Sequence, residues 1–522
     1  MNLGVLSALV VNNMYKFFKK AHKWVGIVIA LFIILFSLSG VILNHRSFFS
    51  SVDLTRNILP TEYRYKNWNN AAVRATLKVE TNRFLVYGNI GIWLTDSTFS
   101  KFNDLNAGLP KGIDNRKIFK VLRTNKGLLA GTLFGLYEFN PISKRWIKLS
   151  LPVPEENVVD LLQKGDSTFV MTRSNLLWSS NLTRFNIIKL PQSEHFDNKI
   201  GLFKTLWVIH SGEIYGDVGK LLVDLMALVF ILLSIGGVIL FFSKKGLKKN
   251  KADFPKRDKL KKTYRWNIKW HNRIGWITGL FLFVTTLTGM FLRPPLLIAI
   301  ANARVKKIPL TELDTFNPCF DALRRIIYIP NEKTFIVSTS EGFYHFDTDF
   351  KTEAKLFDPQ PPASIMGVTV LESLGKDHLM VGSFEGLFKW NYRNGEVYDL
   401  IKQQNYIRPT NIGPPIGDYK ISGFSSDFQQ QTVAFEYEKG AININEGKVF
   451  IAMPENVIDK SPMSLWTLAL EVHTGRIYGA FLGLFYILVV PLGGILVLFT
   501  LITGIVIWFK YHSTKGNKTL KI

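Results

Sequence analysis

Cysteine is almost absent from this sequence, since Cys319 is the only one among 522 residues. A single thiol excludes an intramolecular disulfide, a cysteine-ligated iron–sulfur cluster, a cysteine-based zinc site and CxxCH haem attachment. Metal chemistry in this chain must therefore use histidine, carboxylate or methionine. Charged residues are also sparse, at 20% of the chain against roughly 25% in an average protein. The aromatic content of 13% nevertheless excludes intrinsic disorder, because it supplies ample material for a core.

Four long apolar stretches account for the low charge. Each contains about the 20 apolar residues that a helix needs to cross a hydrocarbon core of ~30 Å. The stretches cover residues 25–43, 221–242, 274–292 and 480–509. The last one contains Pro491, where we expect a kink or a strong tilt rather than a second crossing. We interpret the first as an uncleaved anchor, because no convincing cleavage site accompanies it.

The net charge of +24 is concentrated beside these stretches. Four lysines precede the first one, four follow the last, and residues 243–273 carry a net +11. Lys and Arg accumulate on the cytoplasmic side of a membrane. Both termini and the 243–273 segment are therefore expected in the cytoplasm, with residues 45–210 and 294–470 outside. Topology explains nearly all of the excess charge, so nucleic-acid binding is not expected.

The chain is an internal duplicate. The first stretch opens HKWVG and closes SLSG, and the third opens HNRIG and closes TLTG, at one offset of 249 residues. The second and fourth are preceded by HSGEIYG and HTGRIYG, 263 residues apart. Each half is thus a span, an outer segment and a span. We expect the halves to pack about a pseudo-two-fold axis along the membrane normal.

The outer segments contain repeated hairpins, each an alternating apolar strand, a turn and an aromatic-rich strand. Six copies occur, at residues 84–93, 128–137, 168–178, 334–344, 378–388 and 432–442. Neighbouring copies within a half are spaced like the blades of a propeller. Three blades are too few to close a propeller. We therefore expect one six-bladed β-propeller assembled from both halves, with two separate β-rich domains as the alternative.

Five of the nine histidines lie at or beside the ends of the expected spans: His22, His45, His210, His271 and His473. A bis-histidine haem needs two imidazoles from facing helices, and haem is the main redox centre that a protein holds without cysteine. Two sites, one near each leaflet, would carry electrons across a barrier too wide for one step. The alternative is that these histidines cap helices or meet lipid headgroups.

Two further positions bear on this hypothesis. Gly26 and Gly275 follow His22 and His271 by one helical turn, so they share the histidine face and leave room for a flat macrocycle. Their alternative role is close helix packing. Asp224, near the outer end of the second span, is interpreted as an interfacial carboxylate, with proton transfer as the alternative.

The repeated HKWVG…SLSG, HNRIG…TLTG, HSGEIYG and HTGRIYG blocks resemble those of the PepSY-associated transmembrane helix family. That family includes inner-membrane reductases of ferric siderophores in Gram-negative bacteria, with two b-type haems held by histidines of the spans. The resemblance implies haem ligation by His22, His271, His210 and His473, with His45 as a further candidate. Two features depart from the family. The outer segments contain no convincing PepSY module, and Pro294 stands where a second copy of His45 would be.

The remaining motifs restrict the source of electrons. No GxGxxG fingerprint follows an expected strand, and neither HExxH nor GxSxG occurs. Direct use of a nicotinamide is therefore unsupported, which leaves a cytoplasmic reductant or a membrane quinol. The basic 243–273 segment is either a topology signal only or a docking site for an acidic flavoprotein or anionic lipid.

We thus expect a four-helix transmembrane bundle from two tandem halves plus a periplasmic all-β domain, in a bacterial inner membrane. The expected segments are residues 1–44, 45–210 (blades 1–3), 211–243, 244–270 (a cytoplasmic loop), 271–293, 294–470 (blades 4–6), 471–510 and 511–522. The expected function is electron transfer through two b-type haems to a ferric siderophore or other ferric chelate. The alternative is a non-enzymatic, membrane-anchored propeller that acts as a sensor or scaffold.

Overall fold

The computed structural model describes residues 3–194, 196–249, 253–364, 367–407, 417–428, 431–444 and 451–519. The chain forms two compact units. The helical unit comprises Met1–Arg46, Lys199–Asp314 and Leu468–Ile522, and the β unit comprises Ser47–Asn198 and Thr315–Thr467. Each unit therefore contains residues from both halves of the duplicated sequence.

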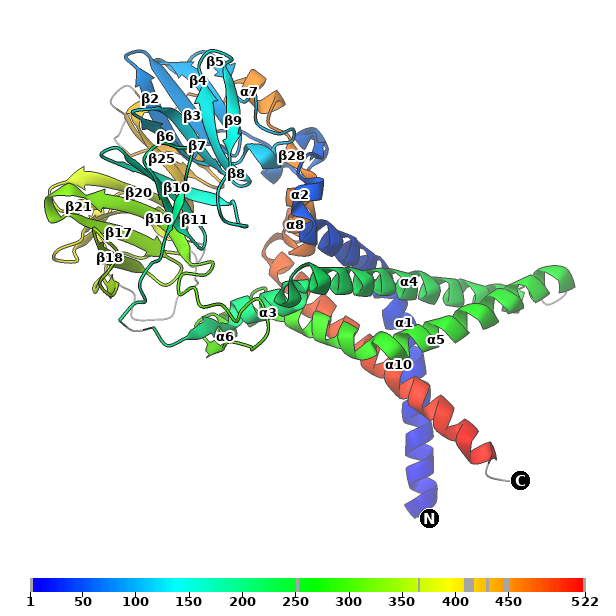
Figure 1. Cartoon of the computed structure of the whole chain (residues 1–522). Coiled ribbons are helices and arrows are strands. Elements are labelled where there is room, and N and C mark those ends of the chain that lie inside the picture. The colour runs from blue at the N-terminus through cyan, green and yellow to red at the C-terminus, as the bar shows by residue number, and fades with distance from the viewer. Residues whose placement is uncertain are drawn as a thin grey trace. The chain divides into compact units, whose positions relative to one another are not determined.

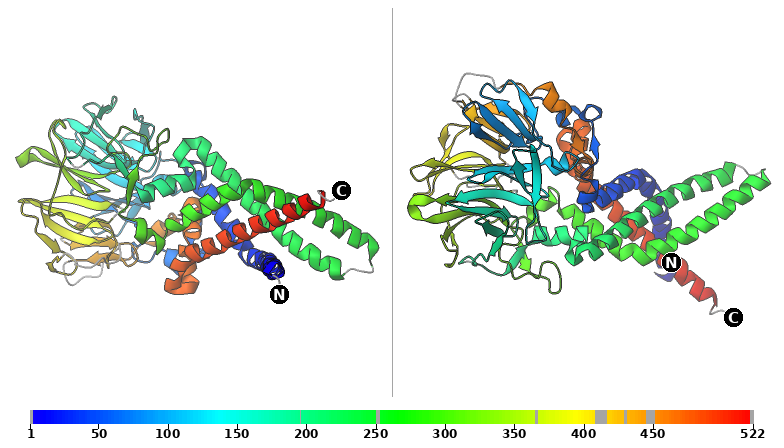
Figure 2. Two further views of the ribbon diagram at one scale, coloured as in Figure 1. Left: turned by 90° about the horizontal axis from the view of Figure 1, so that it is seen from below. Right: turned by 45° about the horizontal axis from the view of Figure 1, so that its top comes forward.

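Four long helices form the helical unit: α1 (Leu3–Asn44), α4 (Gly216–Lys249), α5 (Phe254–Phe291) and α10 (Val489–Thr519). Both α1 and α5 contact α4 and α10, so the four helices close into a ring with α1 opposite α5. Figures 1 and 2 show α4 and α5 running side by side to a shared tip. The shorter elements of the unit include α3 (Leu202–Ser211), η4 (Glu213–Tyr215), α6 (Leu296–Ile300), η6 (Arg476–Tyr478), α9 (Gly479–Leu482), η7 (Gly483–Leu488) and the paired strands β14 (Lys199–Gly201) and β15 (Arg304–Lys306).

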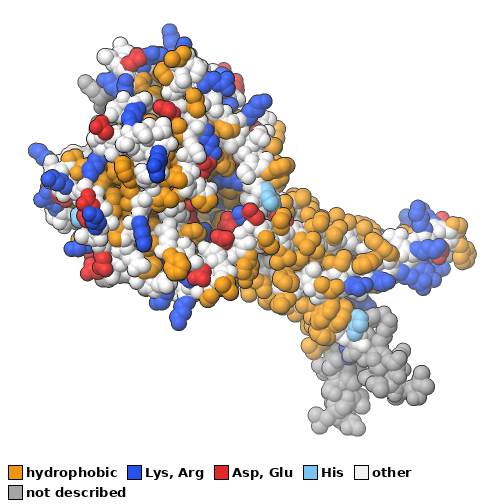
Figure 3. Space-filling view, in the orientation of Figure 1, with side chains coloured by type: hydrophobic (Ala, Val, Ile, Leu, Met, Phe, Trp, Pro, Cys, Tyr) orange, Lys and Arg blue, Asp and Glu red, His pale blue; other side chains and the backbone are white. Residues whose placement is uncertain are grey.

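Four helical segments are long and apolar enough to cross a membrane, which confirms the four expected spans. They are Asn13–Asn44, Glu213–Lys249, Phe254–Phe291 and Arg476–Lys510. Large apolar side chains such as Leu31, Leu221 and Leu280 are exposed on them, and orange side chains cover this unit in Figure 3. An exposed apolar surface of this size is stable in lipid and not in water. The chain is a membrane protein.

Two details of these segments differ from the expectation. The fourth span is interrupted at Gly483, which has a positive φ of 54°, rather than at Pro491. Pro491 lies in the first turn of α10, where a missing N–H costs no hydrogen bond. The expected loop at residues 244–270 is helical up to Lys249 and again from Phe254, because Asp253 caps α5 by accepting a hydrogen bond from the Lys256 amide. Residues 250–252 and the end of the expected tail, 520–522, lie outside the described residues.

The β unit consists chiefly of six antiparallel sheets, in chain order β2–β5, β6–β9, β10–β13, β16–β19, β20–β24 and β25–β27. The strands are β2 (Ala75–Glu80), β3 (Arg83–Gly88), β4 (Gly91–Asp96), β5 (Phe102–Asp104), β6 (Ile118–Thr124), β7 (Gly127–Thr132), β8 (Gly135–Asn140), β9 (Arg145–Leu149), β10 (Val158–Lys164), β11 (Ser167–Thr172), β12 (Leu176–Ser179), β13 (Asn186–Ile188), β16 (Leu323–Ile329), β17 (Thr334–Thr339), β18 (Phe343–Asp347), β19 (Lys355–Leu356), β20 (Val368–Gly375), β21 (His378–Ser383), β22 (Gly386–Asn391), β23 (Val397–Asp399), β24 (Gln404–Asn405), β25 (Ile421–Phe428), β26 (Gln431–Glu436) and β27 (Gly440–Asn443). Each of the six repeated hairpins is the second and third strand of one sheet, which confirms the hairpin prediction.

The sheets contact one another through their first strands. The first strand of each sheet contacts the first strand of the next, and β25 contacts β2. Two hydrophobic cores combine both halves of the chain: one packs Phe169 against Phe335, and the other contains Trp68 and Phe435. The alternative of two separate β domains is therefore wrong, because both halves build one unit.

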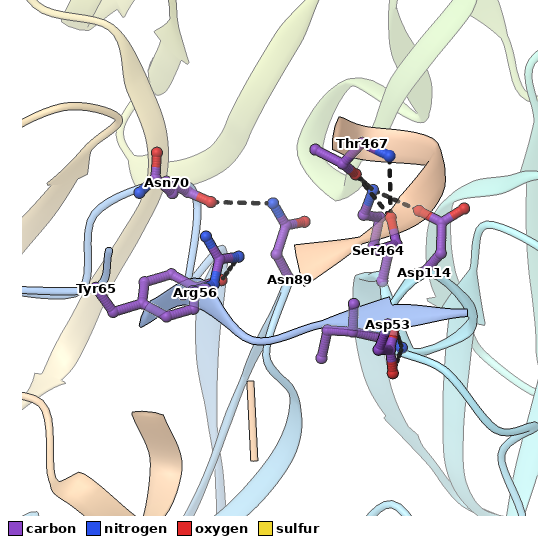
Figure 4. Close-up of polar contacts among 10 residues, drawn as sticks. Asp53, Arg56, Tyr65, Asn70, Asn89, Asp114, Ser464 and Thr467 are labelled. Carbon is purple, nitrogen blue, oxygen red and sulfur yellow. Dashed lines mark hydrogen bonds and ion pairs between the residues drawn. The ribbon is translucent and has the colours of Figure 1, made fainter. Parts of the chain in front are cut away.

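The two ends of the β unit are joined. Strand β1 (Asp53–Leu54) pairs with β28 (Met463–Ser464), and helix α8 (Leu465–His473) follows directly. Ser464 begins this helix by accepting a hydrogen bond from the Thr467 amide at 3.1 Å. Figure 4 shows this junction, with Arg56 nearby donating to the Tyr65 hydroxyl. The remaining short helices are α2 (Arg46–Phe49) and α7 (Glu455–Asp459).

A buried ion pair connects the halves where the third and fourth sheets meet. Arg325 of β16 lies 3.4 Å from Asp160 of β10, and both side chains are almost fully buried. Asp160 also accepts a hydrogen bond from the Ile326 amide at 2.9 Å. The guanidinium donates to the backbone carbonyls of Val159 and Thr369 at 3.1 and 2.8 Å. One side chain thus ties together strands from three sheets.

We expect Asp160→Ala to lower the free energy of unfolding by about 3–5 kcal/mol, because it leaves a buried guanidinium without its counter-charge. The control is Glu80→Ala, since Glu80 pairs with Arg83 at the same 3.4 Å but is 61% exposed. That exposed pair is worth under about 1 kcal/mol. Denaturant unfolding of the detergent-solubilised protein, followed by tryptophan fluorescence, measures both. Equal losses in the two variants would contradict the bridging role of Asp160.

Candidate functional site

Four of the five histidines singled out in the sequence meet in two pairs within the helical unit. The ring centres of His22 and His271 are 6.2 Å apart. Those of His210 and His473 are 5.9 Å apart. Each pair takes one histidine from each half of the chain, as the duplication predicts.

The pairs are presented by different kinds of element. His22 lies within α1 and His271 within α5, on opposite sides of the helical ring. His210 is near the end of α3 and His473 is the last residue of α8. Both of these short helices stop at the glycine of the H-[ST]-G motif, because Gly212 and Gly475 have left-handed φ angles of 83° and 77°. Such a residue terminates a helix at little steric cost only when it is glycine.

A backbone carbonyl anchors the Nδ1 atom of three of the four imidazoles. Nδ1 of His22, His210 and His473 is bound, in that order, to the carbonyl oxygens of Thr500 at 3.0 Å, Thr285 at 2.9 Å and Phe36 at 3.0 Å. Nδ1 of His271 lies near the Leu233 carbonyl, without a hydrogen bond of normal geometry. Each of the three anchored histidines is held by a helix other than its own.

Four residues after each of these carbonyls the sequence has a glycine, against which the histidine packs. A Cβ would lie 2.6 Å from Cε1 of His210 at Gly289, 3.1 Å from His22 at Gly504 and 3.3 Å from His473 at Gly40, all closer than an ordinary contact. At Gly237 it would lie 3.8 Å from His271, which is an ordinary van der Waals contact. Gly40 and Gly289 are the last residues of SLSG and TLTG, so the repeated motif makes room for an imidazole. The structure thus adds a backbone cradle that the sequence motifs did not identify.

Sequence comparison missed Gly237 and Gly504 because the register changes within the fourth span. The HSGEIYG and HTGRIYG motifs are 263 residues apart, whereas these two glycines are 267 apart. The irregular segment formed by α9 and η7 precedes α10 and absorbs the four extra residues. Since four residues are about one helical turn, the glycine returns to the same face.

The two glycines chosen from the sequence do not contact the histidines, and their role in leaving room for a macrocycle stays a prediction. A Cβ at Gly26 would meet only the Thr500 side chain, at 3.9 Å, and one at Gly275 only Leu233, also at 3.9 Å. Both distances are ordinary van der Waals contacts, so neither position requires glycine for space. The structure does not place Gly26 or Gly275 against a histidine.

The anchoring has a chemical consequence. A carbonyl oxygen only accepts hydrogen bonds, so Nδ1 of an anchored imidazole carries the proton and Nε2 keeps its lone pair. In the described part of the chain, no hydrogen bond uses Nε2 of any of the four histidines. All four are partly exposed. An imidazole held in this way is prepared to bind a metal ion through Nε2.

The spacing within each pair fits one metal ion between two imidazoles. Metal–imidazole bonds are about 2.0 Å long, so two rings on opposite sides of one ion have centres roughly 6 Å apart. Among the described residues, no group of three or more His, Cys, Asp or Glu side chains could hold a metal ion. Within the described residues, each pair thus offers two imidazoles and no third side-chain ligand of these types.

The two pairs lie at different depths along the bundle. His22 and Phe36, which anchors His473, are 14 residues apart on α1, and His271 and Thr285 are 14 apart on α5. At 1.5 Å per residue, the pairs are about 21 Å apart along the helices.

His45 belongs to neither pair. Its Nε2 lies 2.6 Å from the Asp224 carboxylate, which also accepts a hydrogen bond from Asn44 at 3.1 Å. Asp224 is thus a helix-end carboxylate with two polar partners. The structure gives His45 a carboxylate rather than a second imidazole.

A family of known proteins matches more than half of this chain, including its last three membrane spans. The family model described as the PepSY-associated TM region matches residues 189–510. No curated protein matches this sequence.

Solved structures resemble the chain only distantly. The extracellular domain of a hybrid two-component system from B. thetaiotaomicron aligns over 72% of this chain at 9% identity and a TM-score of 0.35. This chain covers about a third of that protein's length (33%). The designed Ika8 protein aligns over 71% of this chain and 70% of its own at 7% identity and a TM-score of 0.27.

We expect Gly289→Ala to destabilise the protein by about 1–3 kcal/mol, because the added methyl group overlaps the His210 ring. Gly26→Ala is the matched control, since its methyl group meets only the Thr500 side chain at 3.9 Å. Alanine favours a helix over glycine, so the control should be neutral or slightly stabilising. Thermal unfolding in detergent compares the two, and an unaltered midpoint for Gly289→Ala would contradict the tight histidine cradle.

Proposed function

This chain belongs to the family of proteins with a PepSY-associated TM region, and we propose that it carries electrons across a membrane through two b-type haems. The observation that carries this proposal is the presence of two imidazole pairs with ring centres 6.2 and 5.9 Å apart. Haem iron has four porphyrin nitrogens and needs only two axial ligands from the protein. One pair of histidines supplies both.

The four histidines would form two haem sites. His22 and His271 would hold one haem, and His210 and His473 the other. The carbonyl anchors of His22, His210 and His473 orient these rings and keep Nε2 free, while the glycines allow a close approach. When bound, haem supplies a one-electron iron couple at each depth of the bundle.

The proposed orientation places both termini and the tip of α4 and α5 in the cytoplasm and the β unit in the periplasm of a bacterial inner membrane. Its support is the net +11 of residues 243–273, visible as blue side chains at the tip of α4 and α5 in Figure 3. Short basic segments stay on the cytoplasmic side. In this orientation His22 and His271 form the cytoplasmic pair and His210 and His473 the outer pair.

We also infer that the six sheets close into a single six-bladed β-propeller shared by both halves. Support comes from the successive contacts of first strands, in which β25 also contacts β2. A closed ring gives every sheet a packed neighbour on both sides and leaves only short, protected edges.

The proposed acceptor is a ferric siderophore or another ferric chelate, reduced on the periplasmic side for iron acquisition. The proposed donor is a cytoplasmic reductant or a membrane quinol. The alternative function is a non-enzymatic sensor or scaffold, in which the spans only anchor the β unit. The two functions differ in whether the histidine pairs bind haem.

We expect His271→Ala to lose about half of the bound haem and His473→Ala the other half, because each variant removes one axial ligand from a different pair. The reduced-minus-oxidised absorbance spectrum of purified protein should show b-type bands and measures the haem content. His45→Ala is the control and should retain both haems, since His45 pairs with Asp224. Full haem content in His271→Ala would refute the proposed pairing, and a wild type without haem would favour the sensor.

We further expect proteoliposomes to transfer electrons across the bilayer. With dithionite inside and a ferric chelate plus a ferrous-iron indicator outside, wild-type vesicles should form ferrous iron faster than empty vesicles. His22→Ala and His210→Ala should each return the rate to that of empty vesicles, because each removes a ligand at one of the two depths. Vesicles with His45→Ala should react like wild type. Equal rates with and without wild-type protein would contradict transmembrane electron transfer.

A further inference from the structure

A second candidate site lies inside the β unit, far in sequence from the paired histidines. A small cavity that is open to solvent is lined by residues on or beside the first strands of five sheets. Its charged lining residues are Arg74, Lys120, Asp160, Arg325 and Glu372. The lining also includes apolar side chains, among them Phe119, Val370 and Leu371.

Two of these charged residues are fully occupied by the fold. Arg325 and Asp160 pair with each other, and both also form hydrogen bonds to the backbone of neighbouring strands. As a neutral pair, they contribute no net charge to the cavity. Only Arg74, Lys120 and Glu372 remain to interact with a ligand.

These three side chains have no hydrogen bond or ion pair with any described residue. The Arg74 guanidinium lies over the Phe119 ring at 4.6 Å, and its Nε is buried without a hydrogen-bond partner. A buried charged donor without an acceptor is costly, so such groups usually have a partner in the functional state. With two cations and one carboxylate, this part of the cavity has an excess positive charge.

Burial alone would lower the pKa of Lys120, but the nearby Tyr87, Asp160 and Glu372 outweigh burial and raise it, so Lys120 stays charged. Burial, together with the neighbouring Arg325 charge, lowers the pKa of Arg74 to about 10. The guanidinium still remains charged at neutral pH. Burial also raises the pKa of Glu372, against the opposing effect of the nearby Lys120 and Arg325 charges.

We propose that this cavity binds a small organic carboxylate, of the size of acetate, between Arg74 and Lys120. The planar guanidinium matches a carboxylate in shape and charge. One negative charge balances the excess, whereas a phosphate dianion would be repelled by Glu372. The apolar lining suits an alkyl group and favours an organic anion over chloride. This binding site is independent of the proposed electron transfer, because it uses none of the paired histidines.

The test is a titration of the full-length protein in detergent, in which sodium acetate replaces sodium chloride at constant ionic strength. We expect a saturable rise in the thermal unfolding midpoint and a matching heat of binding. Arg74→Gln should weaken the affinity about tenfold or more, because it removes the charged hydrogen-bond donor. Glu372→Gln should tighten it, because it removes the nearby negative charge. Arg145→Gln is the control and should bind like wild type, since Arg145 is exposed on β9.

Three results would overturn the proposal. Acetate could give no saturable effect, phosphate could bind more tightly than acetate, or Arg74→Gln could bind acetate like wild type. If Arg74→Gln does not fold, Glu372→Gln decides alone: tighter binding supports the site, and unaltered or weaker binding refutes it. Since haem content is measured separately, failure here would leave the electron-transfer proposal intact.

Discussion

The helical unit depends on one interaction: a hydrogen bond from Nδ1 fixes the tautomer and orientation of an imidazole and leaves Nε2 available to a metal. In this bundle the acceptor is the backbone carbonyl of another helix. His210 is bound in this way to Thr285, and His473 to Phe36. The imidazole reaches that carbonyl where the residue one turn later has no side chain to block it. Glycine provides this, which explains why Gly40 and Gly289 close the two repeated motifs. The contacts that pack these helices together are therefore also the contacts that orient the imidazoles.

Because the chain is duplicated, both units are built from parts of the two halves. Each histidine pair takes one ring from each half, so neither half has a complete site. In the β unit the halves meet in mixed hydrophobic cores and in the buried Asp160–Arg325 pair. A single copy of the repeat would expose an apolar core at two sheets and leave its two imidazoles without partners. The two copies must consequently fold together, although they are separate in sequence.

Much of this arrangement could be predicted from the sequence, because its signals are local or repeated. Apolar length predicted four spans, alternating strands predicted six hairpins, and the two offsets predicted which histidines are equivalent. What could not be predicted depends on register and on distant partners. Gly237 and Gly504 escaped comparison because the break before α10 shifts the repeat by four residues, and the Asp253 cap turned an expected loop into helix. His45 resembled the other histidines in sequence, but its partner Asp224 lies 179 residues away. The cavity around Arg74 combines single residues from several strands and has no motif.

The central claim is that two histidines from different halves bind each of two haems. Low-temperature electron paramagnetic resonance of the oxidised, purified protein examines the axial ligands directly. We expect two low-spin ferric signals that are typical of bis-imidazole ligation. Together their intensities should correspond to two haems per chain. High-spin signals, a single centre, or no haem signal at all would contradict it.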